Sequence, residues 1–382
     1  MTLVNRLVQN GTYTEQDGIR YIREIAQTVP TASNVRDYAA IVRDKSLLRR
    51  LIGACEEISE EAYGEQGDAS QLVDAAEQRI FSLAQNREMR EFRHIRDIMA
   101  NVYIDLENLA GNPEHPDRTA TGFSGLDRVL VEMGKGDLIL VGARPGMGKT
   151  SFAMNIATNV AQQTRRSVCI FSLEMSGEQL VNRMLSSEAM VDSYSLRSGE
   201  LKAEDWPRLA DAAAQLSGCE ILIDDSTGLT PTAMKAKLRR VKNLGLVVVD
   251  YLQLMQSGRN IDNRVQEVAD ISRNLKIMAK DLGVPVICCA QLSRGPESRT
   301  SKKPMLSDLR DSGAIEQDAD VVMFLYRDEY YKDQEGGSAG SEANTAEVIV
   351  AKNRHGSTDT VKMGWIGRYT KFRTLDSGSG EV

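Results

Sequence analysis

Residues 137–163 have the sequence DLILVGARPGMGKTSFAMNIATNVAQQ, in which an apolar strand leads through a glycine-containing turn into a helix. This order is the context that a phosphate-binding loop requires. Glycines in the turn let backbone N–H groups close around phosphates, and the dipole of the following helix attracts an anion. The alternative is an ordinary glycine-containing turn before a helix. We predict a nucleotide site made of Ala143, Arg144, Pro145, Gly146, Met147, Gly148, Lys149, Thr150 and Ser151.

The last two positions of this loop motif have specific expected roles. Lys149 would reach the β and γ phosphates, and Thr150 would place its hydroxyl on magnesium. The strict GxxxxGK[ST] pattern begins with glycine, whereas Ala143 stands at that position here. The first position tolerates a small residue, so we still expect ATP and Mg²⁺ as the cofactors.

Short apolar runs rich in Val and Ile alternate with helical or loop segments after this motif. They are DLILVGA, VCIFS, EILID, LGLVVVD, VPVICCA, ADVVMFLY, TAEVIVAK and DTVKMGWI. Such runs are typical of strands buried on both faces of a parallel sheet. We predict an α/β fold with a mostly parallel central sheet, to which the last strands add an antiparallel edge.

The region before the motif has a different pattern. Residues 1–90 are predicted to be helical, from apolar residues near a 3.6-residue spacing, and strand-like runs are absent there. Residues 91–119 are expected to be a linker containing an amphipathic helix, because prolines and glycines then break the pattern. The predicted organisation is a partial helical hairpin domain at 1–90, this linker, and an ATPase domain at 120–382.

Composition excludes some classes of protein. The 382 residues are 41% hydrophobic and 26% charged, with no apolar run of about 18 residues, so we expect no membrane span. The start lacks a secretory h-region, and a cytoplasmic location is expected. The net charge of -7 argues against a protein that coats duplex DNA, although DNA in a locally basic channel fits. The five cysteines show no CxxC spacing and are predicted to be buried free thiols.

Three further polar residues stand at strand ends. Asp250 closes LGLVVVD, in the form of a Walker B segment, where a carboxylate would order magnesium; a turn-capping role is the alternative. Glu174, just past a strand, could take a proton from the attacking water or could be a solvated loop acid. Gln291 could sense the γ-phosphate or form a simple strand-end hydrogen bond.

The sequence resembles the DnaB family of replicative DNA helicases. The matching segments, in the family's order, are ARPGMGKTSFAMN, FSLEMS, IDDSTGLTP, VVVDYLQLM, VQEVADISRNLK, AQLSR, DLRDSGAIEQDAD, FLYRDE and AKNRHG. They cover nearly all of residues 120–375. The resemblance implies a RecA-like P-loop ATPase that translocates on single-stranded DNA as a hexameric ring, with ATP bound between neighbouring subunits, and unwinds duplex DNA.

The resemblance also implies roles for individual residues. Glu174 matches the catalytic base, Lys149 and Thr150 bind phosphates and magnesium, Asp250 is the Walker B acid, and Gln291 links nucleotide to the DNA loop. Arg354, with Lys352 beside it, resembles the arginine finger that reaches the next subunit's γ-phosphate. Taken alone, the KNR segment would indicate only an exposed basic turn.

A DNA-contacting loop is implied by DLRDSG. Arg310, Asp311 and Gly313 are carried over as residues near the DNA backbone, although many relatives have Glu where Asp311 stands. The preceding SRGPESRTSKKP is basic and lacks aromatic residues, which favours backbone contact without base reading; a solvated surface loop is the alternative. Its cations are Arg294, Arg299, Lys302 and Lys303.

The N-terminal part implies partners. The family's N-terminal domain begins with a globular helical bundle, and this chain is expected to start partway through it, near the helical hairpin. The hairpin would pair with another subunit's hairpin, and the linker helix would dock on a neighbour's ATPase domain; packing within the same chain is the alternative. The family resemblance also implies a primase and a helicase loader as partners.

Two other functions share parts of this pattern. A RecA-like recombinase has the same P-loop, Walker B segment and sheet, but the SLEM, DLRDSGAIEQDAD and KNR segments favour the helicase. A nucleotide-regulated scaffold that binds DNA without moving would need neither Glu174 nor Arg354.

Overall fold

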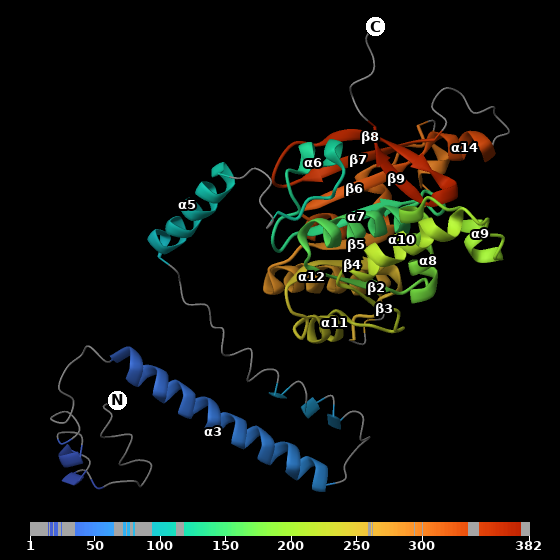
Figure 1. Cartoon of the computed structure of the whole chain (residues 1–382). Helices are drawn as coiled ribbons and strands as arrows, with labels where there is room; N and C mark the ends of the chain where they lie inside the picture. Colours follow the sequence, from blue (N-terminus) through green and yellow to red (C-terminus); the bar gives the residue numbers. More distant parts are fainter. Residues whose placement is uncertain are drawn as a thin grey trace. The chain divides into compact units, whose positions relative to one another are not determined.

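The computed structural model describes residues 14, 16–17, 19–21, 24, 35–64, 72–73, 75–76, 79–80, 94–111, 118–258, 261, 263–293, 295–299, 301–334 and 344–375. The chain divides into two compact units, Met1–Glu107 and Asn108–Val382. Figure 1 draws the helices of the first and the sheet of the second.

The N-terminal unit is helical where it is described. Helix α3 (Val35–Tyr63) is 29 residues long, and α5 (Ile95–Gly111) forms where the linker helix is predicted. Both helices leave apolar side chains exposed in the isolated chain, among them Ile41 and Ile52 of α3 and Ile95 of α5. Within the described ranges, no helix combines the length and the apolar character needed to cross a membrane.

The second unit is built on one sheet with the strand order β3-β2-β4-β5-β1-β6-β7-β8-β9. Strands β3 to β6 in this order pair in parallel, and β6, β7, β8 and β9 pair antiparallel. The predicted α/β fold with a mostly parallel sheet and an antiparallel edge is confirmed. The strands are β1 (Leu138–Ala143), β2 (Ser167–Ser172), β3 (Ile221–Asp224), β4 (Leu244–Asp250), β5 (Val286–Gln291), β6 (Val321–Tyr326), β7 (Thr345–Asn353), β8 (Asp359–Ile366) and β9 (Lys371–Thr374).

Helices connect and cover these strands. The α-helices are α6 (Ser124–Leu130), α7 (Lys149–Thr164), α8 (Gly177–Ala189), α9 (Ser193–Ser198), α10 (Asp205–Ser217), α11 (Pro231–Leu238), α12 (Arg264–Leu282), α13 (Gly313–Asp318) and α14 (Asp328–Gln334). Short 3-10 helices are η3 (Leu252–Leu254), η4 (Gly295–Ser298), η5 (Leu306–Ser312) and η6 (Gly367–Tyr369).

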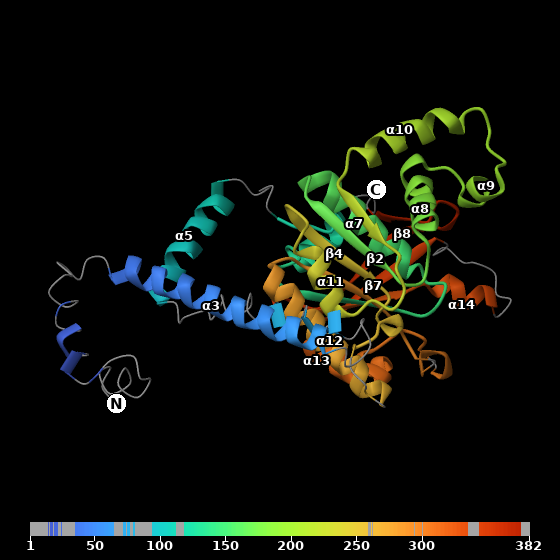
Figure 2. The same cartoon turned by 90° about the horizontal axis from the view of Figure 1, so that it is seen from below.

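The core has two layers because helices cover both faces of the sheet. Figures 1 and 2 show α7 and α8 on one face and α11 and α12 on the other. Alternate residues of β1 enter the two layers: Ile139 and Val141 pack with α7, whereas Leu138 and Leu140 pack with α12. All six residues of β1 are therefore buried, which explains why its sequence is a continuous apolar run.

The cysteines only partly follow the sequence prediction. Cys169, Cys288 and Cys289 are buried in strands, as predicted, and Cys219 is half-buried. The predicted burial is wrong for Cys55, which is exposed on α3, a helix that belongs to the N-terminal unit and not to the core of the sheet.

Candidate functional site

The turn between β1 and α7 has the backbone of a phosphate-binding loop. Gly146 has φ +80° and Gly148 has φ +94°, in the region that favours glycine. A Cβ on Gly146 would lie 2.8 Å from a ring carbon of Tyr330, and one on Gly148 would lie 3.2 Å from Phe372. No side chain caps the start of α7 at Gly148. The first N–H groups of that helix therefore suit an anion.

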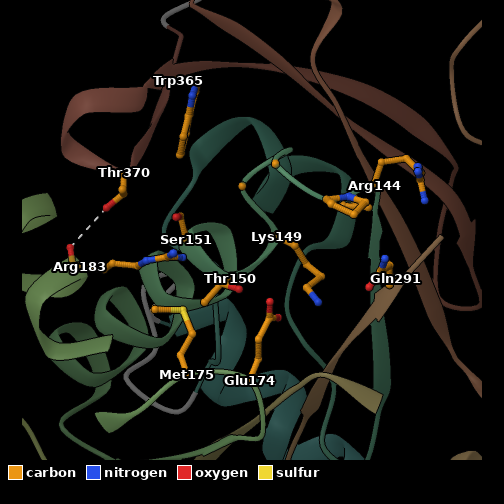
Figure 3. A pocket seen from close by; sticks show the side chains of 14 residues that line it. Arg144, Lys149, Thr150, Ser151, Glu174, Met175, Arg183, Gln291, Trp365 and Thr370 are labelled. Carbon is orange, nitrogen blue, oxygen red and sulfur yellow. Dashed lines mark hydrogen bonds between the residues drawn. The ribbon is translucent and has the colours of Figure 1, made fainter. Parts of the chain in front are cut away.

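The turn opens into a cavity of about 310 Å³ at the carboxyl ends of the parallel strands (Figure 3). All the residues predicted to bind nucleotide line it except Met147, whose side chain is buried in the core beneath the loop. The lining residues are Ala143, Arg144, Pro145, Gly146, Gly148, Lys149, Thr150, Ser151, Glu174, Met175, Arg183, Gln291, Trp365 and Thr370.

Lys149, Thr150 and Asp250 meet at the floor of this cavity. The Thr150 hydroxyl donates to Oδ2 of Asp250 at 2.6 Å, and Nζ of Lys149 lies 3.1 Å from Oδ1. Asp250 is completely buried, and its Oδ1 lacks a hydrogen-bond partner of good geometry among the described residues. Nζ of Lys149 also lies 4.0 Å from the centre of the Tyr251 ring. These oxygens are the hard donors that Mg²⁺ prefers.

Lys149 stays charged in this setting. Burial alone would lower the pKa of Lys149, but attraction to the nearby carboxylates of Asp250 and Glu174 acts against burial, and the pKa lies above its usual value. A charged ammonium at the base of this cavity suits an anion.

Glu174 projects into the cavity from the loop after β2. The Ser172 hydroxyl holds this loop by donating to the Met175 carbonyl at 2.6 Å, and Leu173 N–H donates to the Asp250 carbonyl at 2.7 Å. Figure 3 shows the Glu174 carboxylate pointing toward the space between Lys149 and Thr150. The exposed acid is therefore placed where a proton acceptor for an attacking water would stand.

Gln291 lies at the end of β5, beside Ala143 of β1. The side chain of Gln253, a residue not predicted from the sequence, forms two hydrogen bonds with the backbone of Gln291. Nε2 of Gln253 donates to the Gln291 carbonyl at 3.0 Å, and Gln291 N–H donates to Oε1 of Gln253 at 3.2 Å. Gln253 lies in η3, just past Asp250. The amide thus joins the segment after the Walker B strand to the Gln291 strand.

Four further cavity residues were not predicted from the sequence: Met175, Arg183, Trp365 and Thr370. Burial lowers the pKa of Arg183, while Asp250 and Glu174 act to raise it. The capping box at Ser176 is a sequence signal for a helix that starts shortly after Glu174, but it does not indicate that Arg183, in the second turn of α8, reaches the cavity. The Thr370 hydroxyl donates to the Arg183 carbonyl at 3.4 Å, which ties η6 to α8.

Arg144 lines the cavity but turns its side chain away from the phosphate loop. Its guanidinium pairs with Glu297 at 2.5 Å and donates to the Leu292 carbonyl at 2.9 Å. This pair fastens the loop to η4, in the basic segment after β5.

Arg354 and Lys352 lie near the amino ends of β1 and β6, whereas the cavity lies at the carboxyl ends of the parallel strands. Arg354 donates through its backbone N–H to the carbonyl of Asp320, which immediately precedes β6, at 2.9 Å. Asp320 in turn accepts from the N–H of Leu138, the first residue of β1, at 2.8 Å. The six residues of β1, a length of roughly 20 Å, separate these amino ends from the phosphate loop. Neither cation can complete the cavity of its own chain.

The predicted DNA-contacting residues are described only in part. Arg294 lies outside the described residues, and so do the side chains of Arg310 and Asp311. The backbone of Arg310 and Asp311 lies in η5, and Gly313 begins α13. Arg299 is described, and its guanidinium pairs with the buried carboxylate of Asp308.

The two lysines of the same segment also have partners. Lys302 lies 5.0 Å from the centre of the Tyr331 ring, and Lys303 pairs with Glu347. The basic segment thereby contacts α14 and β7.

Comparisons with known proteins agree along the chain. Residues 119–374 match the family model of the DnaB-like helicase C terminal domain, and residues 1–44 match that of the DnaB-like helicase N terminal domain. The chain is 45% identical over 380 residues to the replicative DNA helicase DnaC of Bacillus subtilis (strain 168), covering 98% of this chain and 83% of the relative. The replicative DNA helicase DnaB of Geobacillus stearothermophilus is 45% identical over 381 residues, with coverage of 98% and 83%.

A solved structure gives the same result. A DnaB-like replicative helicase, described with its interactions with primase, superposes with a TM-score of 0.74 at 31% identity, covering 95% of this chain and 84% of that one. A second solved structure, of an isolated ATPase domain, gives a TM-score of 0.70 at 35% identity, covering 75% of this chain and all of that chain. These relatives do not favour the recombinase or scaffold alternatives.

Proposed function

Because the chain belongs to the DnaB family of replicative DNA helicases, and is a DNA helicase driven by nucleotide hydrolysis, we propose that its cavity binds and hydrolyses ATP with Mg²⁺. The observation that carries this proposal is the meeting of Lys149, Thr150 and Asp250 beneath a glycine turn at a helix N-terminus. We further propose that the functional boundaries are a helical hairpin region at 1–90, a linker at 91–119 and the motor domain at 120–382.

Phosphate binding follows from the contacts of Lys149. Its ammonium is paired with Asp250 at 3.1 Å. A bound γ-phosphate offers more negative charge than one carboxylate, so the ammonium turns from Asp250 toward phosphate while the first N–H groups of α7 hold the phosphates beside it.

The residues released by this exchange fit Mg²⁺. The Thr150 hydroxyl and the Asp250 carboxylate are within 2.6 Å of each other and would hold the ion, directly or through water. The ion would neutralise charge on the transferring phosphoryl group.

Three residues of the same chain would then serve the reaction. Glu174 accepts the proton of the attacking water, because its carboxylate projects between Lys149 and Thr150. Arg183 adds a positive charge on the same wall. Gln291 would sense the γ-phosphate, and its backbone link to Gln253 would pass that state to η3, the segment after β4.

The two remaining cations act on a neighbour. Arg354 and Lys352 lie a full strand length from their own phosphate loop, so we place them in the site of the adjacent subunit. Such an arrangement requires contact between neighbouring subunits, and a homo-hexameric ring is the assembly proposed. An arginine supplied in this way stabilises negative charge in the transition state of phosphoryl transfer.

Single-stranded DNA is the nucleic acid on which we propose that the protein translocates. The candidate contacts are Arg310, Asp311 and Gly313, with Arg294 and Arg299 in the preceding basic segment. Arg299 is already paired with Asp308, so its role is to hold the segment in shape while it adds positive potential. Contacts of this kind bind the DNA backbone irrespective of sequence.

Protein partners are proposed for the helical region. Exposed apolar residues of α3 suit pairing with a second hairpin, and those of α5 suit docking on a neighbouring motor domain. One similar helicase is described with its interactions with primase, and we propose that this chain also binds a primase and a helicase loader.

One experiment tests the whole proposal: unwinding of a forked duplex with ATP and Mg²⁺, together with single-particle imaging of the protein with an ATP analogue and an oligonucleotide. We expect strand separation that EDTA abolishes, and ring-shaped or spiral hexamers. Extended filaments would support a recombinase, and rings that bind DNA without ATP turnover would support a scaffold.

A further inference from the structure

Asp320 is a buried carboxylate that joins three elements of the motor domain at the edge of the sheet opposite the phosphate loop. Its side chain is almost wholly buried, at 5% exposure. Oδ2 accepts from Leu138 N–H at 2.8 Å and from Nζ of Lys276, in α12, at 2.5 Å. Oδ1 accepts from Arg354 at 3.2 Å. Oδ2 therefore binds groups of β1 and α12, and Oδ1 binds the proposed arginine finger.

Arg354 forms several hydrogen bonds with Asp320 and Gln317, which together with Lys352 make up what we call the Asp320 corner. Its backbone N–H donates to the Asp320 carbonyl at 2.9 Å, and its second guanidinium nitrogen donates to the Gln317 carbonyl at 2.7 Å. The side chain nevertheless remains about half exposed, at 48%. A guanidinium has five N–H donors in a fixed fork. Orienting part of the fork inward leaves the rest directed outward for a phosphate.

Lys352 is docked on the same corner. Its ammonium donates to the carbonyls of Glu316 and Ala319, at 2.6 and 2.7 Å, at the end of α13. Burial lowers the pKa of Lys352, and the nearby charge of Arg354 lowers it further, while Asp320 acts in the opposite direction. The carboxylate thus compensates two like charges that would otherwise repel each other.

We propose that Asp320 is the positioning residue that orients Arg354 toward the nucleotide of the adjacent subunit. The inference rests on the proposed trans role of Arg354. A charged group that is oriented before the reaction loses no free energy to reorganisation during it. Removing the charge at Asp320 releases the finger and slows hydrolysis in the neighbour, while the phosphate loop of the same chain stays intact.

A metal ion does not account for this corner as well as a positioning role does. Asp137, Asp320 and His355 have ligand atoms within 4.8 Å of one another. The charge of Asp320, however, is already balanced by Lys276 and Arg354, and both oxygens of its carboxylate accept hydrogen bonds. The cluster is therefore an ion-pair network around the finger.

The test uses Asp320→Asn, which keeps the size of the side chain and an acceptor for Leu138 N–H. We expect kcat of ATP hydrolysis to fall roughly ten- to hundredfold with KM for ATP unchanged. The matched control is Asp137→Asn, in the same network, whose carboxylate contacts His355 at 3.0 Å and not Arg354. It should keep wild-type kcat. Equal losses in both variants would show that any charge removed from this corner has the same effect, and would overturn the proposal.

Mixed rings separate positioning from simple damage. Asp320→Asn subunits retain their phosphate loop, and Lys149→Ala subunits retain a correctly held finger, so a mixture under subunit exchange should exceed both parents in ATPase rate. If Arg354→Ala complements Lys149→Ala but Asp320→Asn does not, the positioning role fails and the trans finger stands. If neither mixture recovers, the trans assignment itself fails.

A second variant covers the case in which Asp320→Asn folds poorly because the half-buried Lys276 is left without a counter-charge. Asp320→Asn combined with Lys276→Met removes both charges together. It should show the same fall in kcat and the same recovery in mixed rings. A folded double variant with wild-type kcat would overturn the proposal.

Discussion

Nζ of Lys149 lies 3.1 Å from Oδ1 of Asp250, so the cation that we propose to bind phosphate is paired with the carboxylate that we propose to hold magnesium. The Thr150 hydroxyl occupies the other oxygen of the same carboxylate at 2.6 Å. Nucleotide binding must therefore exchange partners at Asp250, and ATP and Mg²⁺ should bind cooperatively.

Lys149→Ala should abolish ATP hydrolysis and unwinding together, because the γ-phosphate loses its main cation. We expect a loss of at least about a hundredfold in kcat. Steady-state ATPase and forked-duplex assays measure both, with Lys280→Ala, an exposed lysine on α12, as the control for loss of one charge. Turnover at the wild-type rate would remove Lys149 from the mechanism.

Glu174→Gln should separate binding from hydrolysis. The amide keeps the shape of the side chain but cannot accept the proton of the attacking water, so turnover should fall by roughly 10² to 10⁴ while nucleotide affinity is retained. Fluorescent nucleotide titration and single-turnover hydrolysis provide the two readouts. Glu178→Gln, at an exposed acid in the first turn of α8, is the matched control. Unchanged turnover in Glu174→Gln would mean that another acid is the base.

Arg354→Ala should cripple turnover by roughly a thousandfold and leave nucleotide affinity largely intact, because an arginine finger acts mainly on the transition state. The ATPase rate is measured against the mixing ratio with Lys149→Ala under conditions of proven subunit exchange. A maximum at intermediate ratios is expected. Mixtures that never exceed the two parents would contradict the trans role.

Arg310→Ala should weaken single-strand binding about equally for all sequences. One lost phosphate contact lowers the dependence of log K on log salt by roughly 0.7. Fluorescence anisotropy with several oligonucleotides across a salt series gives the slope. Basal ATPase should survive while its stimulation by single strands falls. A loss confined to some sequences would indicate base contacts instead.

Exposed cysteines should react with alkylating reagents faster than buried cysteines. Burial raises the pKa of Cys288 to about 12 and that of Cys169 to about 11, so at pH 8 almost none of either is the reactive thiolate. Cys55 is exposed and should react first with iodoacetamide. Mass spectrometry of the native and the unfolded protein measures the order. Early alkylation of Cys288 in the native protein would contradict its burial.

The sheet was predictable because both of its faces are covered, which leaves continuous apolar runs in the sequence. The strand that escaped prediction, β9, has only four residues, of which Phe372 alone is fully buried. Its sequence KFRT carries no comparable signal.

The cavity was predictable only where its residues follow strands directly. Glu174, Asp250 and Gln291 stand at strand ends, and parallel strands bring such ends to one edge. Arg183 enters from the second turn of a helix, and Trp365 from the antiparallel edge. Their place at the cavity depends on tertiary packing that local sequence does not encode.

The opposite placement of Lys149 and Arg354 on one sheet has a consequence for mixed populations of subunits. Under the trans assignment, hydrolysis belongs to a pair of neighbours, and each chain contributes to one site as binder and to another as donor. A subunit that lost both residues would silence two sites while still occupying a place in the ring. In genetic terms such an allele would be dominant, and its harm would exceed its share of the protein in the cell.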